Sequence, residues 1–392
     1  MLLLRRSRIR AFTLIELMLS TAVLALLMAL MLTVVGQTQQ IWVRSSGKVA
    51  QFQASRTAFE AMTRNLSQAT LNTYYDLQFD RTPGPTLGQT KGYSRNSDLH
   101  FVSGKAAQAK FLGTDPATYP THAVFFQAPL GSTGEVTGTG ATAAKKYRTL
   151  SNLLSATGYY VKWGIDDKRP PFITSVGIPD RYRYRLMEVI QPAESFGVFD
   201  TQRTPPPKAN DWIQTALGIK TLPTSTDTSA PSGKVDSSRA LAENVVALVI
   251  LPKLSDKDTA APFLTPNYEY DSRPVDGGGA RKAWATLTKG TTEYNHFNQL
   301  PPVVQVTMVA IDEPSAVRQQ SYSTSAPTWT KTLFETCTKV EDVAKDLGDP
   351  DNLQPDTLIY RLAPPPGTTS GPKMNYRIYT MDVVIRGSKW SN

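Results

Sequence analysis

A single glutamate interrupts the long apolar run near the start of this chain. The run extends from Phe12 to Val35, 24 residues, and Glu16 is its only charged side chain. As a helix it would extend about 36 Å, enough to cross the hydrocarbon core of a membrane with some tilt. Four arginines and no acidic residue precede it. The positive-inside tendency therefore predicts that residues 1–11 stay in the cytoplasm and that the rest of the chain crosses the membrane.

Two ordinary explanations of the run leave Glu16 unexplained. A secretory signal peptide has a shorter apolar region of about 7 to 15 residues and ends in a small-residue cleavage site, which is absent here. A plain membrane anchor has the right length but no use for a carboxylate, which costs about 2.5 to 3.5 kcal/mol within a membrane helix. Glu16 is therefore a candidate functional residue.

The basic leader, residues 1–11, followed by FTLIEL at residues 12–17, resembles the type IV prepilin N-terminal signal. Pilins, minor pilins and type II secretion pseudopilins share this signal. The resemblance implies that a prepilin peptidase cuts between Ala11 and Phe12 and methylates the new amine, giving N-methylphenylalanine. It also implies that Glu16 pairs with the Phe12 amino group of a neighbouring subunit, where two costly charges neutralise each other. Ala11 departs from the pattern, since glycine is usual at that position.

A second helical pattern follows the apolar run. Phe52, Phe59 and Leu66 recur at intervals of seven, with Met62 and Ala69 at the i+3 positions, and there is no proline from residue 37 to residue 71. This spacing places one apolar stripe along a helix. We therefore expect the membrane helix to continue outward as an amphipathic helix that packs against the rest of the protein.

Beyond residue 75 the pattern changes to short β-like runs separated by turn-rich segments. The chain is predicted to be α+β and pilin-like: a long N-terminal helix, membrane-spanning in its first half, packed on an antiparallel β-sheet body with long loop insertions. The expected parts are a leader at 1–11, a transmembrane and assembly helix at 12–35, its amphipathic continuation at 36–75, and an extracytoplasmic body at 76–392. The predicted strands are Asp98–Ser103, Ala123–Gln127, Tyr159–Trp163, Tyr182–Ile190, Val245–Leu251, Val303–Ile311 and Tyr376–Ile385, and the predicted insertions are 131–146, 204–238 and 363–373.

A weaker resemblance extends past the signal. The segments AFEAMTRNLSQA, LAENVVALVI, QLPPVVQVTMVAID and YRIYTMDVVIRG follow in an order similar to that of the larger J-type minor pseudopilins and W-type minor pilins. The layout also resembles the Verru_Chthon cassette protein C family. These likenesses, and the size of the body, imply a minor subunit of a filament or secretion apparatus rather than a major pilin. Its expected location is the inner membrane, with the body in the periplasm or at the cell surface.

The composition offers little for catalysis. The histidines His100, His122 and His296 have no metal-ligand spacing, and the lone cysteine, Cys337, rules out an intramolecular disulfide and a multi-cysteine zinc site. An acidic stretch with Asp346, Asp349, Asp351 and Asp356 has oxygen ligands for calcium but lacks the EF-hand spacing, and is better explained as a helix end and a polar turn. We therefore predict no enzyme activity, cofactor or metal.

The segment RYRYRLME is the most amphipathic strand pattern. Arg181, Arg183 and Arg185 alternate with tyrosines and a leucine, so a strand would carry the arginines on one face. One interpretation is a contact for a polyanion such as a surface polysaccharide; the other is a half-buried strand whose arginines face water. The net charge is +9, or +5 without the leader, so no specific nucleic-acid partner is expected.

The leading hypothesis is thus a minor pilin-like structural subunit whose partners are prepilin peptidase, related subunits and the inner membrane. The alternative is a membrane-tethered module that binds a surface polymer or a secreted substrate.

Overall fold

The computed structural model describes the chain from Thr13 to Lys389 with gaps. Its α+β architecture, a long helix followed by antiparallel sheets, is consistent with a pilin-like fold and confirms the predicted fold class. The chain divides into two compact units, Met1–Gln51 and Phe52–Asn392. The described residues are 13–79, 90–133, 136–137, 144–145, 149–150, 152–165, 170–178, 180–199, 210–218, 237–254, 264–273, 297–322, 325–327, 333–337, 340–365 and 373–389.

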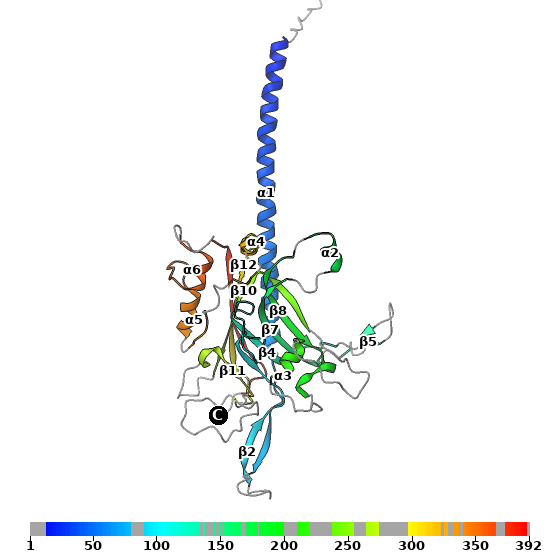
Figure 1. Ribbon diagram of the computed structural model, residues 1–392, viewed down its shortest axis with the longest axis vertical. Helices are drawn as coiled ribbons and strands as arrows, with labels where there is room; N and C mark the ends of the chain where they lie inside the picture. Colours follow the sequence, from blue (N-terminus) through cyan, green and yellow to red (C-terminus); the bar gives the residue numbers. More distant parts are fainter. Residues whose placement is uncertain are drawn as a thin grey trace, which may run out of the picture. The chain divides into compact units, whose positions relative to one another are not determined.

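Helix α1 (Leu14–Ser67) is continuous over 54 residues (Figure 1). It contains no proline, so every turn can keep its backbone hydrogen bonds. At its end the chain tightens through i to i+3 bonds, in which the amides of Gln68 and Ala69 donate to the carbonyls of Asn65 and Leu66. The helix ends at Ser67, short of the expected residue 75, and a strand begins at Tyr74.

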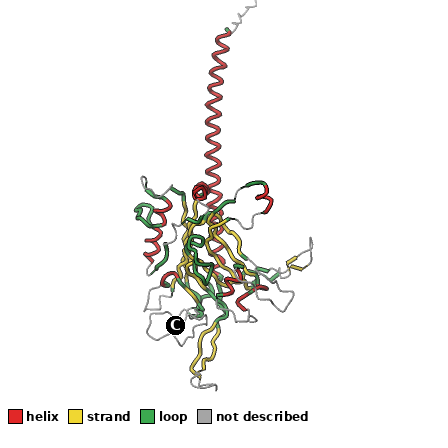
Figure 2. The backbone as a smooth tube through the Cα atoms, viewed as in Figure 1, coloured by secondary structure: helices red, strands yellow, loops and turns green. Residues whose placement is uncertain are grey.

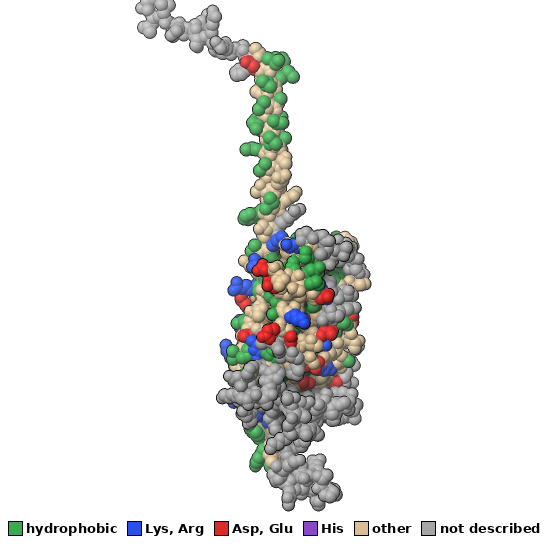
Figure 3. All heavy atoms as spheres, turned by 90° about the vertical axis from the view of Figure 1, so that its left-hand side faces the viewer, with side chains coloured by type: hydrophobic (Ala, Val, Ile, Leu, Met, Phe, Trp, Pro, Cys, Tyr) green, Lys and Arg blue, Asp and Glu red, His purple; other side chains and the backbone are tan. Residues whose placement is uncertain are grey.

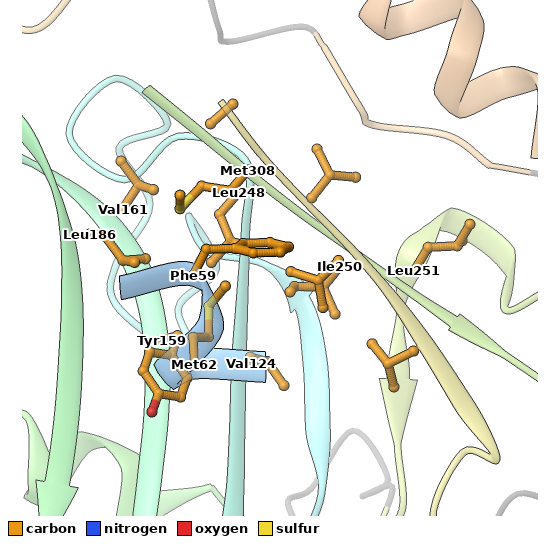
Figure 4. Packing of buried hydrophobic residues seen from close by; sticks show 14 of the residues in the cluster. Phe59, Met62, Val124, Tyr159, Val161, Leu186, Leu248, Ile250, Leu251 and Met308 are labelled. Carbon is orange, nitrogen blue, oxygen red and sulfur yellow. The ribbon is translucent and has the colours of Figure 1, made fainter. Parts of the chain in front are cut away.

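The last turns of α1 are built into the core of the second unit. Phe59, Met62, Leu66 and Ala69 are buried, as the apolar stripe predicts. Figure 4 shows Phe59 and Met62 among side chains from the two main sheets. The ring of Phe59 lies 5.8 Å from that of Tyr379, centroid to centroid. These contacts hold this part of the helix on the body.

The larger sheet has six antiparallel strands, and both of its faces are covered. Side chains on alternate positions of its central strands belong to two separate apolar clusters, so the strands are buried almost continuously. One cluster includes the buried side of the last turns of α1, and the other contains Trp212 and Ile213. The strand order is β11 (Tyr270–Asp271), β3 (Val102–Lys105), β4 (His122–Pro129), β7 (Leu154–Gly164), β8 (Arg183–Gln191) and β9 (Ser238–Glu243).

The second main sheet has three antiparallel strands in the order β10 (Val245–Lys253), β12 (Val303–Ile311) and β13 (Tyr376–Val384). Two side chains, of Thr121 just before β4 and of His122 at its first position, link this second sheet to the larger one. The hydroxyl of Thr121 accepts a hydrogen bond from the Leu248 amide at 3.0 Å, and Nδ1 of His122 accepts one from the Ile250 amide at 3.1 Å. The amides of β10 at these positions are thereby satisfied by side chains rather than by another strand.

A two-stranded ribbon, β1 (Tyr74–Phe79) and β2 (Thr90–Asn96), extends from the body (Figure 2). Its base is fixed by Asn72, whose side-chain oxygen accepts hydrogen bonds from the amides of Asp98 and Leu99. The remaining short elements are β5 (Val136–Thr137), β6 (Ala144–Lys145), α2 (Pro171–Ser175), α3 (Asp211–Ala216), α4 (Glu313–Tyr322), α5 (Val340–Leu347), α6 (Leu358–Leu362) and 3-10 turns at Ala193–Ser195, Gly197–Phe199 and Pro266–Tyr268.

Six of the seven predicted strands are confirmed, and β12 has the predicted bounds. The prediction of a strand over Asp98–Ser103 is wrong in its placement, because β3 begins only at Val102. The insertion predicted at 204–238 contains a helix, α3, whose Trp212 and Ile213 fill the second apolar cluster. Most of the residues in the three predicted insertions lie outside the described part of the chain.

Candidate assembly and membrane site

Thr13 and Glu16 together form the start of α1. One carboxylate oxygen of Glu16, Oε2, accepts hydrogen bonds from the Thr13 amide at 3.1 Å and from the Thr13 hydroxyl at 2.9 Å. In return the Glu16 amide donates to the Thr13 hydroxyl at 3.4 Å. This is a capping box, in which the two side chains satisfy amides that the first helical turn leaves without partners. Sequence reasoning missed this role of Thr13, although the Thr-x-x-Glu spacing is its signal.

The apolar segment of α1 carries three further polar side chains. Ser20 and Thr21 donate their hydroxyls to the carbonyls of Leu17 and Met18, and Thr33 donates to the carbonyl of Ala29, at 2.9 to 3.0 Å. Hydroxyls bonded back to the helix are suited to a medium without water, because no polar group is left unsatisfied.

Helix α1 is long and apolar enough to cross a membrane. Among the described residues it is the one helix that meets this test, with a mean hydropathy of 2.5 over its most apolar 18 residues, none of which is buried within the protein. Leu14, Leu26 and Met31 are each more than half exposed. These side chains need an apolar environment outside the chain itself, either lipid or other helices.

Of the three residues predicted to act in maturation and assembly, the structure describes one. Glu16 lies in the first turn of α1. Ala11 and Phe12, the predicted cleavage and methylation positions, lie outside the described residues. Their roles remain predictions from the sequence.

The prediction that the arginines of RYRYRLME face water is wrong for two of the three. Arg183 and Arg185 are only 2% and 4% exposed. Nη2 of Arg183 donates to Oε1 of Glu313 at 2.8 Å, and Nη1 of Arg185 donates to the carbonyl of Gly164 at 2.6 Å. Arg181 is exposed but precedes the strand. The three arginines therefore do not form one exposed stripe for a polyanion.

The face of β8 that carries Arg183 and Arg185 is covered rather than open to water. Met187 and Val189 continue this face, and both pack in the second apolar cluster. An alternating pattern indicates a half-buried strand only where one face meets water, and here both faces are covered. The tyrosine side of the prediction is confirmed, because Tyr184 is buried on the opposite face.

Glu313 compensates the buried charge of Arg183. Its second oxygen accepts a hydrogen bond from the side-chain amide of Asn244 at 2.8 Å. Partial burial acts to raise the pKa of Glu313, but the hydrogen bonds from Arg183 and Asn244 outweigh it and hold the pKa below its usual value. The three side chains tie the start of β8 to the corner before β10 and to the first turn of α4.

His100 and His122 are both buried, and both serve the interior. The indole N–H of Trp212 donates to Nδ1 of His100 at 3.2 Å, so Nε2 carries the proton and donates to Asp271 at 2.7 Å. Nε2 of His122 donates to the Phe334 carbonyl at 2.9 Å while its Nδ1 accepts from Ile250. Both nitrogens of each ring are therefore engaged in hydrogen bonds within the protein interior. His296 lies outside the described residues.

Cys337 and the acidic stretch also have structural surroundings. Cys337 is buried, and its carbonyl accepts a hydrogen bond from the Asn267 amide. Asp346 accepts from the Phe334 amide at 2.7 Å, and Asp356 pairs with Arg361 at 3.3 Å. Within the described part of the chain, no group of three or more His, Cys, Asp or Glu side chains is arranged to hold a metal ion.

Replacing the buried Arg183 should lower the stability of the fold far more than replacing the exposed Arg181. We expect Arg183→Ala to lower the free energy of unfolding by about 2 to 3 kcal/mol, because it leaves Glu313 without its charged partner. Arg181→Ala should change it by less than about 0.5 kcal/mol. Urea unfolding of the detergent-solubilised chain measures both, and equal losses in the two variants would contradict the buried ion pair.

His122 should make the fold sensitive to mild acid. Burial lowers the pKa of His122 to about 4, and the nearby charge of Lys105 adds to this, against a value near 6.5 in the unfolded chain. The unfolded state therefore binds more protons below pH 6.5. The stability associated with neutral His122 is complete above pH 6.5 and is lost as the pH falls toward 4, by about 2 kcal/mol between pH 7.5 and pH 5.

His122→Gln separates this effect from the titration of other groups. The variant will be less stable at every pH, but the additional loss between pH 7.5 and pH 5 should shrink by about 2 kcal/mol, because glutamine does not titrate. Urea unfolding at the two pH values gives the difference. The same pH dependence in both proteins would show that His122 is not its source.

A comparison with known protein families finds a match at the start of the chain. Residues 6–32 match the family model of the prokaryotic N-terminal methylation motif. No curated protein and no solved structure matches the chain. The matched segment contains Ala11, Phe12 and Glu16 together with most of the apolar run. The motif and the apolar helix support a type IV pilin-like protein that is processed by prepilin peptidase, assembles with other pilin subunits and is anchored in the inner membrane.

Proposed function

We propose that this chain is a minor subunit of a bacterial envelope filament or secretion apparatus, pilin-like or pseudopilin-like. The single observation that carries the proposal is the methylation motif at residues 6–32, which runs into a helix, Leu14–Ser67, whose apolar half is exposed. The chain inserts by this helix with its leader in the cytoplasm. Prepilin peptidase cuts between Ala11 and Phe12, and the mature subunit assembles with related subunits through the apolar helix.

The charge of Glu16 favours assembly over the isolated subunit. Before assembly the carboxylate is held by the hydroxyl and amide of Thr13, which reduces the cost of keeping it in an apolar environment but leaves its charge in place. The amino group created at Phe12 of a neighbouring subunit supplies the opposite charge. Pairing the two groups in a helix bundle removes two uncompensated charges at once, so the assembled state is favoured.

The size of the body supports a minor role. The second unit extends over more than three hundred residues and carries a projecting ribbon, β1–β2, whose described side chains Tyr75 and Tyr93 are 65% and 75% exposed. Such a body would pack poorly in the repeated wall of a filament made of one subunit. A position of low copy number, where irregular surfaces face solvent or a partner, suits it better.

Nothing in the described surface favours the polymer-binding alternative through the arginines, since two of the three are buried in ion pairs and backbone hydrogen bonds. The proposed role of the body is therefore that of the specific partner-binding part of a structural subunit, without a polyanion contact at these arginines.

Glu16→Ala and Thr13→Val distinguish charge pairing from helix capping. Both variants lose the capping box, but only Glu16→Ala loses the carboxylate. We expect both to be processed, and we expect recovery of Glu16→Ala in cross-linked complexes with related subunits to fall by about tenfold or more, while Thr13→Val stays near the unaltered level.

Immunoblotting of the processed chain and of the cross-linked complexes measures the two steps separately. Equal losses of complex in both variants would assign Glu16 to capping alone, and normal co-assembly of Glu16→Ala would remove the pairing mechanism.

A further inference from the structure

Helix α1 carries a second apolar group beyond its long apolar segment. Ile41, Trp42 and Val43 are 67%, 73% and 67% exposed. Figure 3 shows a shorter group of hydrophobic side chains on the helix, separated from the long apolar segment by a polar stretch. That stretch contains the polar residues Gln37–Gln40. We call Ile41, Trp42 and Val43 the apolar ring.

The geometry of the helix limits what can cover the apolar ring. Consecutive residues of a helix point about 100° apart, so these three side chains cover about 200° of the circumference. One partner helix or one sheet contacts a narrower face than this. Three neighbouring side chains that point in such different directions fit a surrounding layer better than a single docking face.

The position of the apolar ring along the helix identifies that layer. From Leu14 to Trp42 the helix rises about 42 Å, close to the 40 to 45 Å of a bilayer with both headgroup layers. The leader arginines lie just before this segment. If these arginines mark the cytoplasmic headgroups, Trp42 lies at the opposite headgroup layer. Helical side chains also lean toward the N-terminus of their helix, which directs the indole of Trp42 back toward the hydrocarbon.

The chemistry of the segment suits the headgroup layer. Tryptophan combines a large apolar ring with one N–H donor and is enriched at membrane–water interfaces for that reason. The polar stretch before it supplies side-chain amides, from Gln37, Gln39 and Gln40, that can hydrogen-bond phosphate and glycerol oxygens. Isoleucine and valine on either side of Trp42 add apolar area at the boundary.

We propose that the apolar ring binds the phospholipid headgroup layer on the outer face of the membrane and fixes the depth of α1. This inference rests on the proposed function, in which Leu14–Val35 spans the membrane. Before processing, the arginines hold the cytoplasmic end of the helix. After cleavage at Ala11 they are gone, and the apolar ring keeps Glu16 at the depth from which it pairs with a neighbouring subunit.

The test measures the depth of the Trp42 indole in the full-length chain. The protein is reconstituted in vesicles of phosphatidylethanolamine and phosphatidylglycerol that contain lipids brominated at different acyl positions. Subtracting the fluorescence of Trp42→Phe removes the signal of the other tryptophans. We expect bromines nearest the headgroups to quench the Trp42 signal about twofold more than bromines near the chain ends, with little quenching by aqueous acrylamide.

A second variant provides a depth scale. Combining Trp42→Phe with Thr38→Trp moves the indole one helical turn, about 6 Å, toward the apolar segment. Its quenching should shift toward bromines placed deeper in the acyl chains. An unchanged depth profile would overturn the proposal, because the signal would then not follow the position along the helix.

Other results overturn the proposal in distinct ways. Strong acrylamide quenching without bromine quenching would place Trp42 in water. Protection from both quenchers would show that protein, such as a second copy of the chain, covers the apolar ring. If the full-length chain fails to float with the vesicles, the membrane-spanning function itself is wrong, which is distinguishable from an inserted helix whose Trp42 lies at another depth.

Discussion

Helix α1 has to satisfy two different environments with one continuous backbone. In its first half, hydrogen bonds within the helix occupy the backbone, and the hydroxyls of Ser20, Thr21 and Thr33 bond back to carbonyls. Even the carboxylate of Glu16 is bonded locally, to Thr13. In its last turns one side of the same helix becomes part of a protein core. Substitutions in the two halves should therefore affect different properties, insertion and assembly in the first and folding of the body in the second.

The body is organised around the last turns of that helix. Phe59 and Met62 lie among side chains of both main sheets, so the buried side of the helix joins the two sheets, while Arg56 and Glu60 on its other side are exposed (Figure 4). Tyr159 shows how closely helix and sheet are joined: its hydroxyl accepts a hydrogen bond from Asn65 of α1 and donates one to Glu188, which also binds Arg239. Burial and the charge of Glu188 raise the pKa of Tyr159, so its hydroxyl stays protonated as a donor.

Local patterns in the sequence predict the elements that depend on local rules. The seven-residue spacing of Phe59 and Leu66 gives the buried face of α1, and the apolar run Val303–Ile311 gives β12 to the residue. The prediction that the arginines of RYRYRLME face water was wrong because the burial of Arg183 depends on a residue distant in sequence, Glu313, which supplies the counter-charge. Residues 12–17 predict the assembly site for a different reason, since a charge in an apolar run is costly enough to require a function.

The most direct test of this account is the N-terminus of the protein recovered from the membranes of its host. Intact mass and N-terminal sequencing should give a chain that begins at N-methylated Phe12, lacking the eleven residues through Ala11. That result would place the protein in the prepilin pathway and make its assembly partners the next question. A chain that retains Met1, or one cut beyond Val35, would contradict the account, because the first is a simple anchor and the second a secreted protein.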